Sequence, residues 1–199
     1  MTKQNCKIIN GYIEGYYGKL LTWEDRERIL KRLKNNKMFN YLYAPKEDNF
    51  HRNNWRKPYD KVWNKKFKIF CESAKLKKIN IVFGISPGID FNFNNLDNIN
   101  ENSDFIILLE KCLFAIKLGA TSIVLQFDDI PDHFKSKYKT KLSEGTAHSC
   151  LTNELSKRLK CNMFVIPRIY SDELIDSSKN YLLDFGFKLN KSLKVFYCG

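Results

Sequence analysis

The most informative stretch of this chain is SIVLQFDDIP, residues 122–131. Its first six residues form a short apolar run with β-branched members, which predicts a buried strand. Two carboxylates, Asp128 and Asp129, follow this run directly, and Pro131 comes soon after. Because neighbouring positions of the run are apolar, both faces of the strand should be covered, as in a parallel sheet with helices on one side. The stretch therefore predicts an α/β protein with two acids at the mouth of a buried strand.

Comparable runs occur on both sides of this strand, and helical periodicity separates them. Helices are predicted after Thr22, which can cap together with Asp25, and over residues 63–74, 105–116, 151–159 and 181–189. Strand starts recur every ~30 to 40 residues, which is the size of one β-α unit. This alternation without hairpin turns predicts a parallel sheet in one domain, residues 1–199. The other predicted strands are Ile8–Ile13, Phe39–Ala44, Ile79–Ser86, Met163–Pro167 and Leu193–Tyr197.

Either a doubly wound sheet or a (β/α) barrel fits this alternation. No G-x-G-x-x-G or phosphate-binding loop motif follows the first strand, which weakens the nucleotide-binding form of the doubly wound sheet. In both architectures the chemistry lies where strands end and the following loops begin. Those positions hold Gly15 after the first strand, Lys46 after the second, the Asp pair after the fourth and Tyr170 after the fifth.

These residue types suit a sugar site, although each has a simpler explanation. Gly15 leaves room for a ligand near the backbone, but turn geometry alone could require it. Lys46 can donate to hydroxyl groups, but a lysine at a strand end is usually a surface residue. Tyr170 can stack on a sugar or donate its hydroxyl, but it could equally be a packing tyrosine.

The Asp pair is the strongest candidate for catalysis. Adjacent carboxylates repel each other, so we expect the pKa of one of them to be raised. Paired carboxylates with separated pKa values are the working groups of glycoside hydrolysis. A helix N-cap, a metal ligand and an exposed loop charge are the alternative explanations of the pair.

The chain contains, in this order, the motifs GYIEGYYG, YLYAPKEDNFHRNNWRKPY, FGISPGIDF, FDDIP and AHSCLTNEL. In their order and spacing these five motifs resemble those of glycoside hydrolase family 84, which comprises protein O-GlcNAcases and bacterial β-N-acetylglucosaminidases, sometimes labelled hyaluronidase-like. The resemblance runs from about Tyr12 to Gly199 and implies a TIM-type (β/α) barrel and a retaining β-N-acetylglucosaminidase. It also implies substrate-assisted catalysis through an oxazoline, without a cofactor or metal, on N-acetylglucosamine attached to protein or within a glycan.

The same resemblance implies a role for each candidate residue. Asp128 would orient and polarise the acetamido N–H of the substrate, and Asp129 would be the general acid and base. Gly15 and Lys46 match positions that contact the sugar hydroxyls, and Tyr170 matches the tyrosine that binds the acetamido carbonyl. Where the family commonly has Thr-Glu before that tyrosine, this chain has Arg168-Ile169, which would add a charge near the acetamido pocket.

The predicted strands number six, whereas the family's barrel has eight β-α units. We therefore expect a partial barrel whose first and sixth strands are not paired with each other. Apolar positions such as Ile8, Val195 and Tyr197 would then face water. Open edges favour self-association or a partner that covers them. The chain is expected to be oligomeric or weakly folded and a weak hydrolase, and the alternative function is an inactive sugar-binding or interaction protein.

Composition bears on partners and location. The formal net charge is +12, but the basic residues are spread along the chain, whereas a footprint for phosphates should be a concentrated patch. We therefore expect no nucleic-acid partner. No apolar stretch is long enough to span a membrane, and no apolar segment follows the polar start at 1–7. The six cysteines show no C-x-x-C pair and are expected to be reduced in a cytoplasmic protein.

Overall fold

The structure is a computed structural model, and it describes residues 10–177 and 179–198. Its six strands form one parallel sheet in the order β1-β2-β3-β4-β5-β6, so neighbours in sequence are neighbours in space. The strands are β1 (Gly11–Glu14), β2 (Asn40–Tyr43), β3 (Asn80–Ile85), β4 (Ser122–Gln126), β5 (Asn162–Ile166) and β6 (Lys194–Val195).

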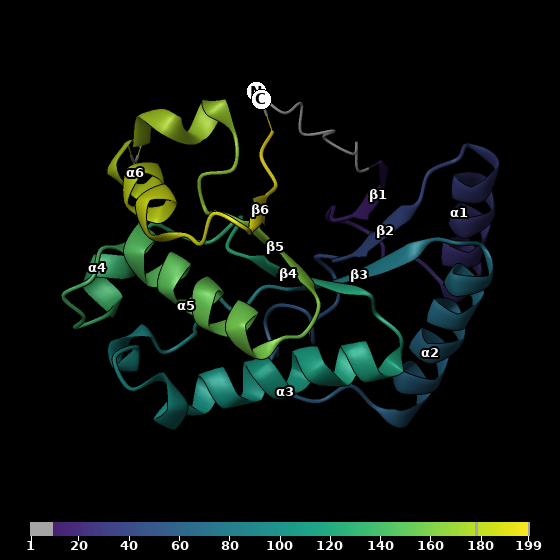
Figure 1. Cartoon of the computed structure of the whole chain (residues 1–199), viewed down its shortest axis with the longest axis horizontal. Coiled ribbons are helices and arrows are strands. Elements are labelled where there is room, and N and C mark those ends of the chain that lie inside the picture. Colours follow the sequence, from purple (N-terminus) through teal and green to yellow (C-terminus); the bar gives the residue numbers. More distant parts are fainter. Residues whose placement is uncertain (1–9, 178, 199) are drawn as a thin grey trace.

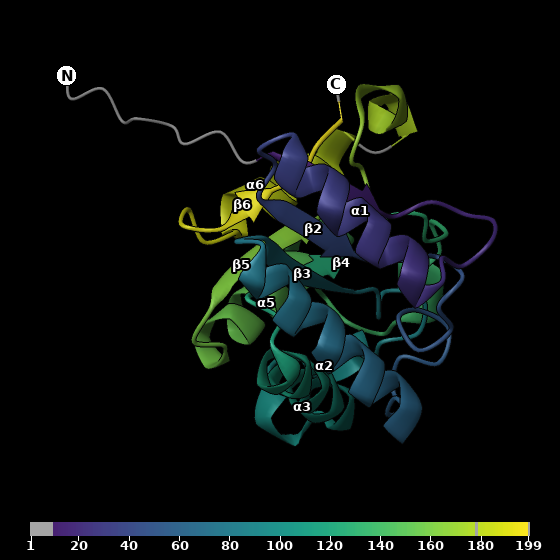
Figure 2. The ribbon, with the colours of Figure 1, turned by 90° about the vertical axis from the view of Figure 1, so that its right-hand side faces the viewer.

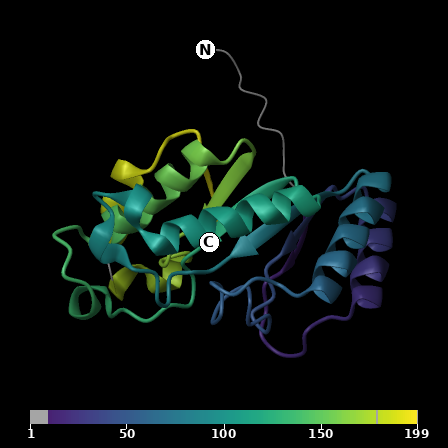
Figure 3. The same ribbon diagram turned by 90° about the horizontal axis from the view of Figure 1, so that it is seen from below.

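Helices connect the strands and form an outer layer around the curved sheet (Figure 1). Figure 2 shows α1 and α2 side by side in front of β2 and β3, and Figure 3 shows α3 running along the outside of the molecule. The sheet curls without joining β1 to β6, which confirms the predicted partial (β/α) barrel. The helices are α1 (Trp23–Asn35), α2 (Lys61–Leu76), α3 (Ser103–Leu118), α4 (Phe134–Lys137), α5 (Glu144–Arg158) and α6 (Lys179–Lys188), with 3-10 turns η1 (Phe93–Asn95), η2 (Ile99–Glu101) and η3 (Asp172–Ser177).

Local signals in the sequence explain where the helices begin and end. Thr22 and Asp25 form the predicted capping box at the start of α1, in which each side chain accepts from the other residue's backbone N–H. At the start of α2 the Asp60 side chain alone forms the cap, by accepting from Trp63 N. Gly119 ends α3 at φ 119°, a left-handed conformation in which a side chain would be strained. The five helices predicted from periodicity are all present.

The sheet is apolar on both faces, as the sequence of β4 predicted. Its outer face packs against the helices in a large core that includes Phe67, Phe83 and Leu125. Its inner face carries a smaller cluster formed by Leu42, Ala44, Val82 and Val124, against which Phe164, Ile166 and Phe196 pack. The outer core fixes the helices against the sheet, and the inner cluster packs on the concave face of the half-barrel.

The two outer strands leave apolar side chains partly open to water. Ile13 on β1 is 50% exposed, and Val195 on β6 is 44% exposed. Tyr197 is 43% exposed, and its hydroxyl donates to Asp172 Oδ1 at 2.9 Å. Ile8, which was expected at the same edge, lies outside the described residues. Two strand edges therefore retain unpaired backbone groups, as expected for a barrel that is not closed.

The cysteines are free thiols wherever the structure describes them. Cys71 on α2 and Cys112 on α3 are buried at the predicted apolar helix positions, and burial raises the pKa of Cys71 to about 12. Cys6 lies outside the described residues. Within 10–177 and 179–198, no helix is both long enough and apolar enough to cross a lipid bilayer.

Candidate active site

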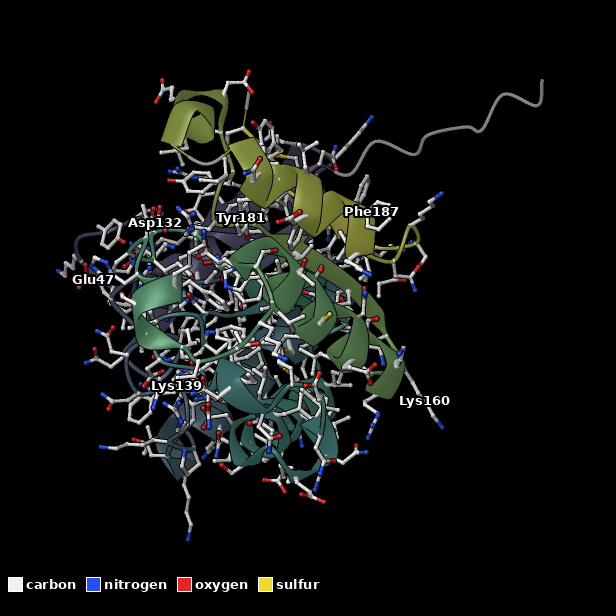
Figure 4. The ribbon with its side chains drawn as sticks, turned by 90° about the vertical axis from the view of Figure 1, so that its left-hand side faces the viewer. Glu47, Asp132, Lys139, Lys160, Tyr181 and Phe187 are labelled. Atoms are coloured by element: carbon white, nitrogen blue, oxygen red, sulfur yellow. The ribbon has the colours of Figure 1, made fainter. Side chains whose placement is uncertain are left out.

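The carboxyl ends of the parallel strands bring four of the five candidate residues into one cluster. Lys46 follows β2, Asp128 and Asp129 follow β4, and Tyr170 follows β5. All of them lie on loops that leave the same edge of the sheet, because every strand points the same way. Figure 4 shows this end of the molecule on the side where Glu47 and Asp132, from the same two loops as Lys46 and the Asp pair, are labelled.

The centre of the cluster is the ammonium group of Lys46. Lys46 Nζ forms a hydrogen bond and ion pair with Asp128 Oδ2 and lies 3.2 Å from Asp129 Oδ2. The Lys46 side chain is only 2% exposed, compared with 11% for Asp128 and 28% for Asp129. Gln126 Nε2 adds a donor to Asp128 Oδ1 at 3.5 Å. A buried cation between two carboxylates offsets the repulsion that an isolated Asp pair would suffer.

Asp129 is held by both its side chain and its main chain. Tyr170 Oη donates to Asp129 Oδ1 at 3.0 Å, and Tyr17 Oη donates to Asp129 Oδ2 at 3.1 Å. Arg52 Nη2 donates to the main-chain oxygen of Asp129. The backbone of Asp129 adopts φ 56°, a left-handed conformation that is uncommon for a residue with a side chain. Such conformations persist where surrounding contacts fix them, and they are concentrated at functional sites.

The expected rise in pKa is not found at Asp129, whose pKa is lowered from its ordinary value of 3.8. Partial burial alone would raise the pKa of this carboxyl group, but the Lys46 ammonium and the hydrogen bonds from Lys46, Tyr170 and Tyr17 outweigh that effect. Repulsion between the two acids would raise the pKa of one of them, but the lysine that lies between the acids outweighs this effect at Asp129. With these partners Asp129 is therefore a carboxylate at neutral pH.

Gly15 lies on the same edge, at the end of β1, and it is half-buried. A Cβ at this position would meet only Ile13 Cγ2, at 3.0 Å, and no other atom within 4 Å. The space beyond the Gly15 backbone is therefore open, as a close approach by a ligand requires.

Two other acids at this edge are fully engaged in the core. The Glu14 carboxylate pairs with Arg26 at 2.7 Å and accepts from Tyr41 Oη at 2.6 Å. Asp48 accepts from Tyr43 Oη at 2.7 Å and from Tyr59 Oη at 2.8 Å. Asp128 and Asp129 thus differ from these two acids in sharing one lysine, and Asp129 also accepts from two tyrosine hydroxyls.

Arg168, which precedes Tyr170 on the loop after β5, has charged and aromatic partners on other segments. Its guanidinium lies 2.8 Å from Glu144 Oε2 and 3.7 Å from Asp132 Oδ1, and it lies over the ring of Tyr181 at 5.1 Å. Glu144 begins α5, and Tyr181 belongs to α6. These contacts link Arg168 to the helix layer and to the loop after β4.

Tyr17, Arg52 and Gln126 were not identified as functional candidates from the sequence. Tyr17 stands two residues after Gly15 in a motif at the end of a strand, which is the one signal that could have selected it. Arg52 reaches the site through the path of the loop after β2. Gln126 reaches it as the last residue of β4. Within the described residues, no group of three or more His, Cys, Asp or Glu side chains could hold a metal ion.

The fold and this cluster define a protein of the (β/α)-barrel class with an acid–lysine–tyrosine site at the carboxyl ends of its strands. Residues 10–199 match the family described as β-N-acetylglucosaminidase. The chain therefore belongs to the β-N-acetylglucosaminidases of glycoside hydrolase family 84.

Individual relatives agree with this assignment. The protein O-GlcNAcases of Mus musculus and Rattus norvegicus are each 28% identical over an alignment of 207 residues, which covers 97% of this chain and 21% of the relative. The structure of CpGH84B superimposes with a TM-score of 0.83 at 27% identity and covers 96% of this chain and 33% of that chain. A mutant of Thermobaculum terrenum O-GlcNAc hydrolase superimposes with a TM-score of 0.81 at 27% identity, covering 96% and 41%. The chain thus spans about a fifth of the length of the curated relatives that it matches.

Proposed function

We propose that the chain is a retaining β-N-acetylglucosaminidase that removes N-acetylglucosamine from protein or glycan by substrate-assisted catalysis. The observation that carries this proposal is the bridge from Lys46 to both Asp128 and Asp129, with Tyr170 bound to the second acid. Family membership supports the hydrolase role. The single-domain organisation over 1–199 and a cytoplasmic location belong to the same proposal.

In the first step, the acetamido oxygen of the substrate attacks the anomeric carbon and an oxazoline forms. Asp128 accepts a hydrogen bond from the acetamido N–H and stabilises the positive charge that develops on the acetamido group. The bond to the leaving oxygen breaks as Asp129 gives that oxygen a proton. In the second step, Asp129 removes a proton from water, which opens the oxazoline and restores the β configuration.

The lowered pKa of Asp129 sets a condition for this mechanism, because a general acid must carry a proton when the substrate is bound. Binding of the acetamido carbonyl would draw the Tyr170 hydroxyl away from Asp129. A bound sugar would also exclude water from a carboxyl group that is now partly exposed. Both changes raise the pKa of Asp129, so we propose that it takes up its proton as the substrate binds.

Lys46 and Gly15 complete the sugar site in this proposal. An ammonium group has three N–H donors. Lys46 directs one donor to each of the two carboxylates, so the third remains for a sugar hydroxyl. The open space at Gly15 allows the sugar ring to approach the end of β1. No step of the reaction needs a cofactor or a metal ion.

The test is the release of an aryl group from an aryl β-N-acetylglucosaminide by the purified chain. We expect turnover that disappears in Asp128→Asn and persists in Lys139→Gln, which removes one exposed charge of the opposite sign on the loop after α4. Turnover that survives in Asp128→Asn, or that is absent from the unmodified chain, would contradict the proposal.

A second candidate is a sugar-binding or interaction protein without turnover. The observation that favours it is the open sheet, whose edge strands β1 and β6 expose Ile13 and Val195. On this proposal a second copy or another partner covers the two edges. Calorimetry would detect binding of N-acetylglucosamine without product, and analytical ultracentrifugation would detect the self-association.

A further inference from the structure

The face of the molecule opposite the candidate active site collects positive charge. In a parallel β-α fold all helices point the same way, so their carboxyl-terminal ends meet at the amino-terminal edge of the sheet. The last turns of the helices are basic: Arg32 and Lys34 in α1, Lys75 in α2, Lys117 in α3, and Lys157 and Arg158 in α5. The first turns carry acids instead in α1, α3 and α5.

Each helix places its charges in this way for a local reason, because cations are favourable near the carboxyl-terminal end of a helix dipole. The parallel topology then adds these local preferences together. Lysines that are spread along the sequence become neighbours on one face. Figure 4 shows the two ends of the molecule: Glu47, Asp132 and Lys139 lie at one end and Lys160 at the other.

The basic face is hollowed rather than flat. A hollow of about 900 Å3 is lined by Lys78, Lys157 and Lys194, and by no acid. A second hollow of about 610 Å3 is lined by Lys68, Lys75, Lys78 and Lys117, with Glu72 as its acid. Lys78, Asn80 and Thr121 line both hollows, so the two are contiguous.

Most of these lysines are available to a partner. Two of them form ion pairs: Lys157 lies 2.5 Å from Glu154, and Lys68 lies 3.9 Å from Glu72. For Lys75, Lys78, Lys117 and Lys194, the part of the chain that the structure describes offers no carboxylate within 4.0 Å. All four side chains are exposed. Like charges gathered without partners repel one another, and an anionic partner would relieve that repulsion.

The remaining lining residues distinguish between anionic partners. The larger hollow also carries the amide side chains of Asn10, Asn40, Asn80, Asn162 and Asn190. Most of these amides already hydrogen-bond within the fold, but among the described residues the Asn162 side chain and Asn80 Oδ1 have no such partner. A peptide main chain offers a donor and an acceptor to such groups, whereas a phosphate group only accepts. Neither hollow is lined by arginine, the side chain best matched to phosphate. We infer that this face is a docking surface for an acidic peptide segment of a partner protein.

The experiment is fluorescence anisotropy of the whole chain with a labelled glutamate-rich peptide, at low and at physiological salt. We expect binding that weakens as salt rises, since exposed charges are screened. A lysine-rich peptide of the same length should not bind. A single-stranded oligonucleotide of matched charge should bind more weakly than the acidic peptide, and tighter binding of the oligonucleotide would overturn the inference.

A pair of double variants locates the surface. Lys78→Glu with Lys194→Glu reverses two charges in the larger hollow, and we expect affinity for the acidic peptide to fall about tenfold or more. The control, Lys135→Glu with Lys139→Glu, makes the same change in net charge among exposed lysines of the opposite end and should leave affinity within about twofold. Equal losses in both variants, with unchanged circular dichroism, would show attraction by net charge alone and refute the surface. Absence of binding by the unmodified chain would refute it as well.

Discussion

The two edges of the sheet use charge in opposite ways. At the carboxyl edge, Lys46 is buried between Asp128 and Asp129, and each group has partners within hydrogen-bond distance. At the amino edge, Lys78 and Lys194 are exposed and stand among other lysines. Burial makes a charge depend on its partners, whereas exposure leaves it free to act on something outside the molecule. The difference predicts where substitutions will change the fold and the chemistry and where they will change only association.

The largest effect is expected from Lys46→Met. This variant removes the cation between two carboxylates and leaves Asp128 buried without its ion-pair partner. Breaking a buried pair in this way costs about 3 to 5 kcal/mol, so the free energy of unfolding should fall by that order. Urea denaturation followed by circular dichroism measures it. A loss below about 1 kcal/mol would mean that the site tolerates the unpaired acids, contrary to the geometry.

The next effect is on rate and concerns Asp129→Ala. Removal of a general acid should slow the hydrolysis of aryl β-N-acetylglucosaminides with poor leaving groups by about 100-fold to 10,000-fold, and much less for good leaving groups, which depart unaided. Added azide should yield no glycosyl azide of inverted configuration, because no enzyme carboxylate is the nucleophile. Equal losses on good and poor leaving groups would remove Asp129 from the role of acid.

A smaller effect is expected in the pH dependence of stability. The pKa of Asp129 is lowered in the folded chain from its ordinary value of 3.8. Its carboxylate therefore stabilises the folded state at pH values above 3.8. That contribution is lost as the pH falls through the lowered folded-state pKa. The difference in unfolding free energy between the unmodified chain and Asp129→Asn should therefore shrink as the pH is lowered below 3.8. A difference that grows over this range would mean that the pKa is raised instead.

The smallest effect on stability is expected at the amino edge. Lys194→Met removes an exposed charge without an ion-pair partner among the described residues, so the free energy of unfolding should change by less than about 0.5 kcal/mol. The same denaturation assay as for Lys46→Met supplies the contrast between the two lysines. A loss as large as that of Lys46→Met would erase the distinction between the two edges.

Much of the fold could be predicted from the sequence, because period and capping are local properties. The apolar run of β4, the capping box at Thr22 and the glycine after α3 all act over a few residues. The site could be predicted to the extent that the ends of the strands could, since parallel strands place Lys46, the Asp pair and Tyr170 at one edge of the sheet. The positions of these residues followed from the strand ends, and the family resemblance was needed only to assign a role to each residue.

What the sequence could not supply are contacts between distant segments. Lys46 and Asp128 are 82 residues apart, and the direction of the pKa change at Asp129 depends on the contact of the same lysine with Asp129. Arg52 reaches the main chain of Asp129 across 77 residues. The basic face was missed for the same reason, because lysines that are spread along the chain give no patch until the helices are aligned.

The central claim is that Asp128 and Asp129 serve a reaction in which the substrate's own acetamido group is the nucleophile. Its most direct test compares two aryl substrates that share a leaving group and differ only in an N-acetyl or an N-trifluoroacetyl group. Fluorine withdraws electrons from the acetamido oxygen, so the account predicts a fall of at least about 100-fold in kcat/KM, or about 2.7 kcal/mol in the barrier. Equal rates on the two substrates would contradict it, since they would show that the acetamido oxygen does not attack.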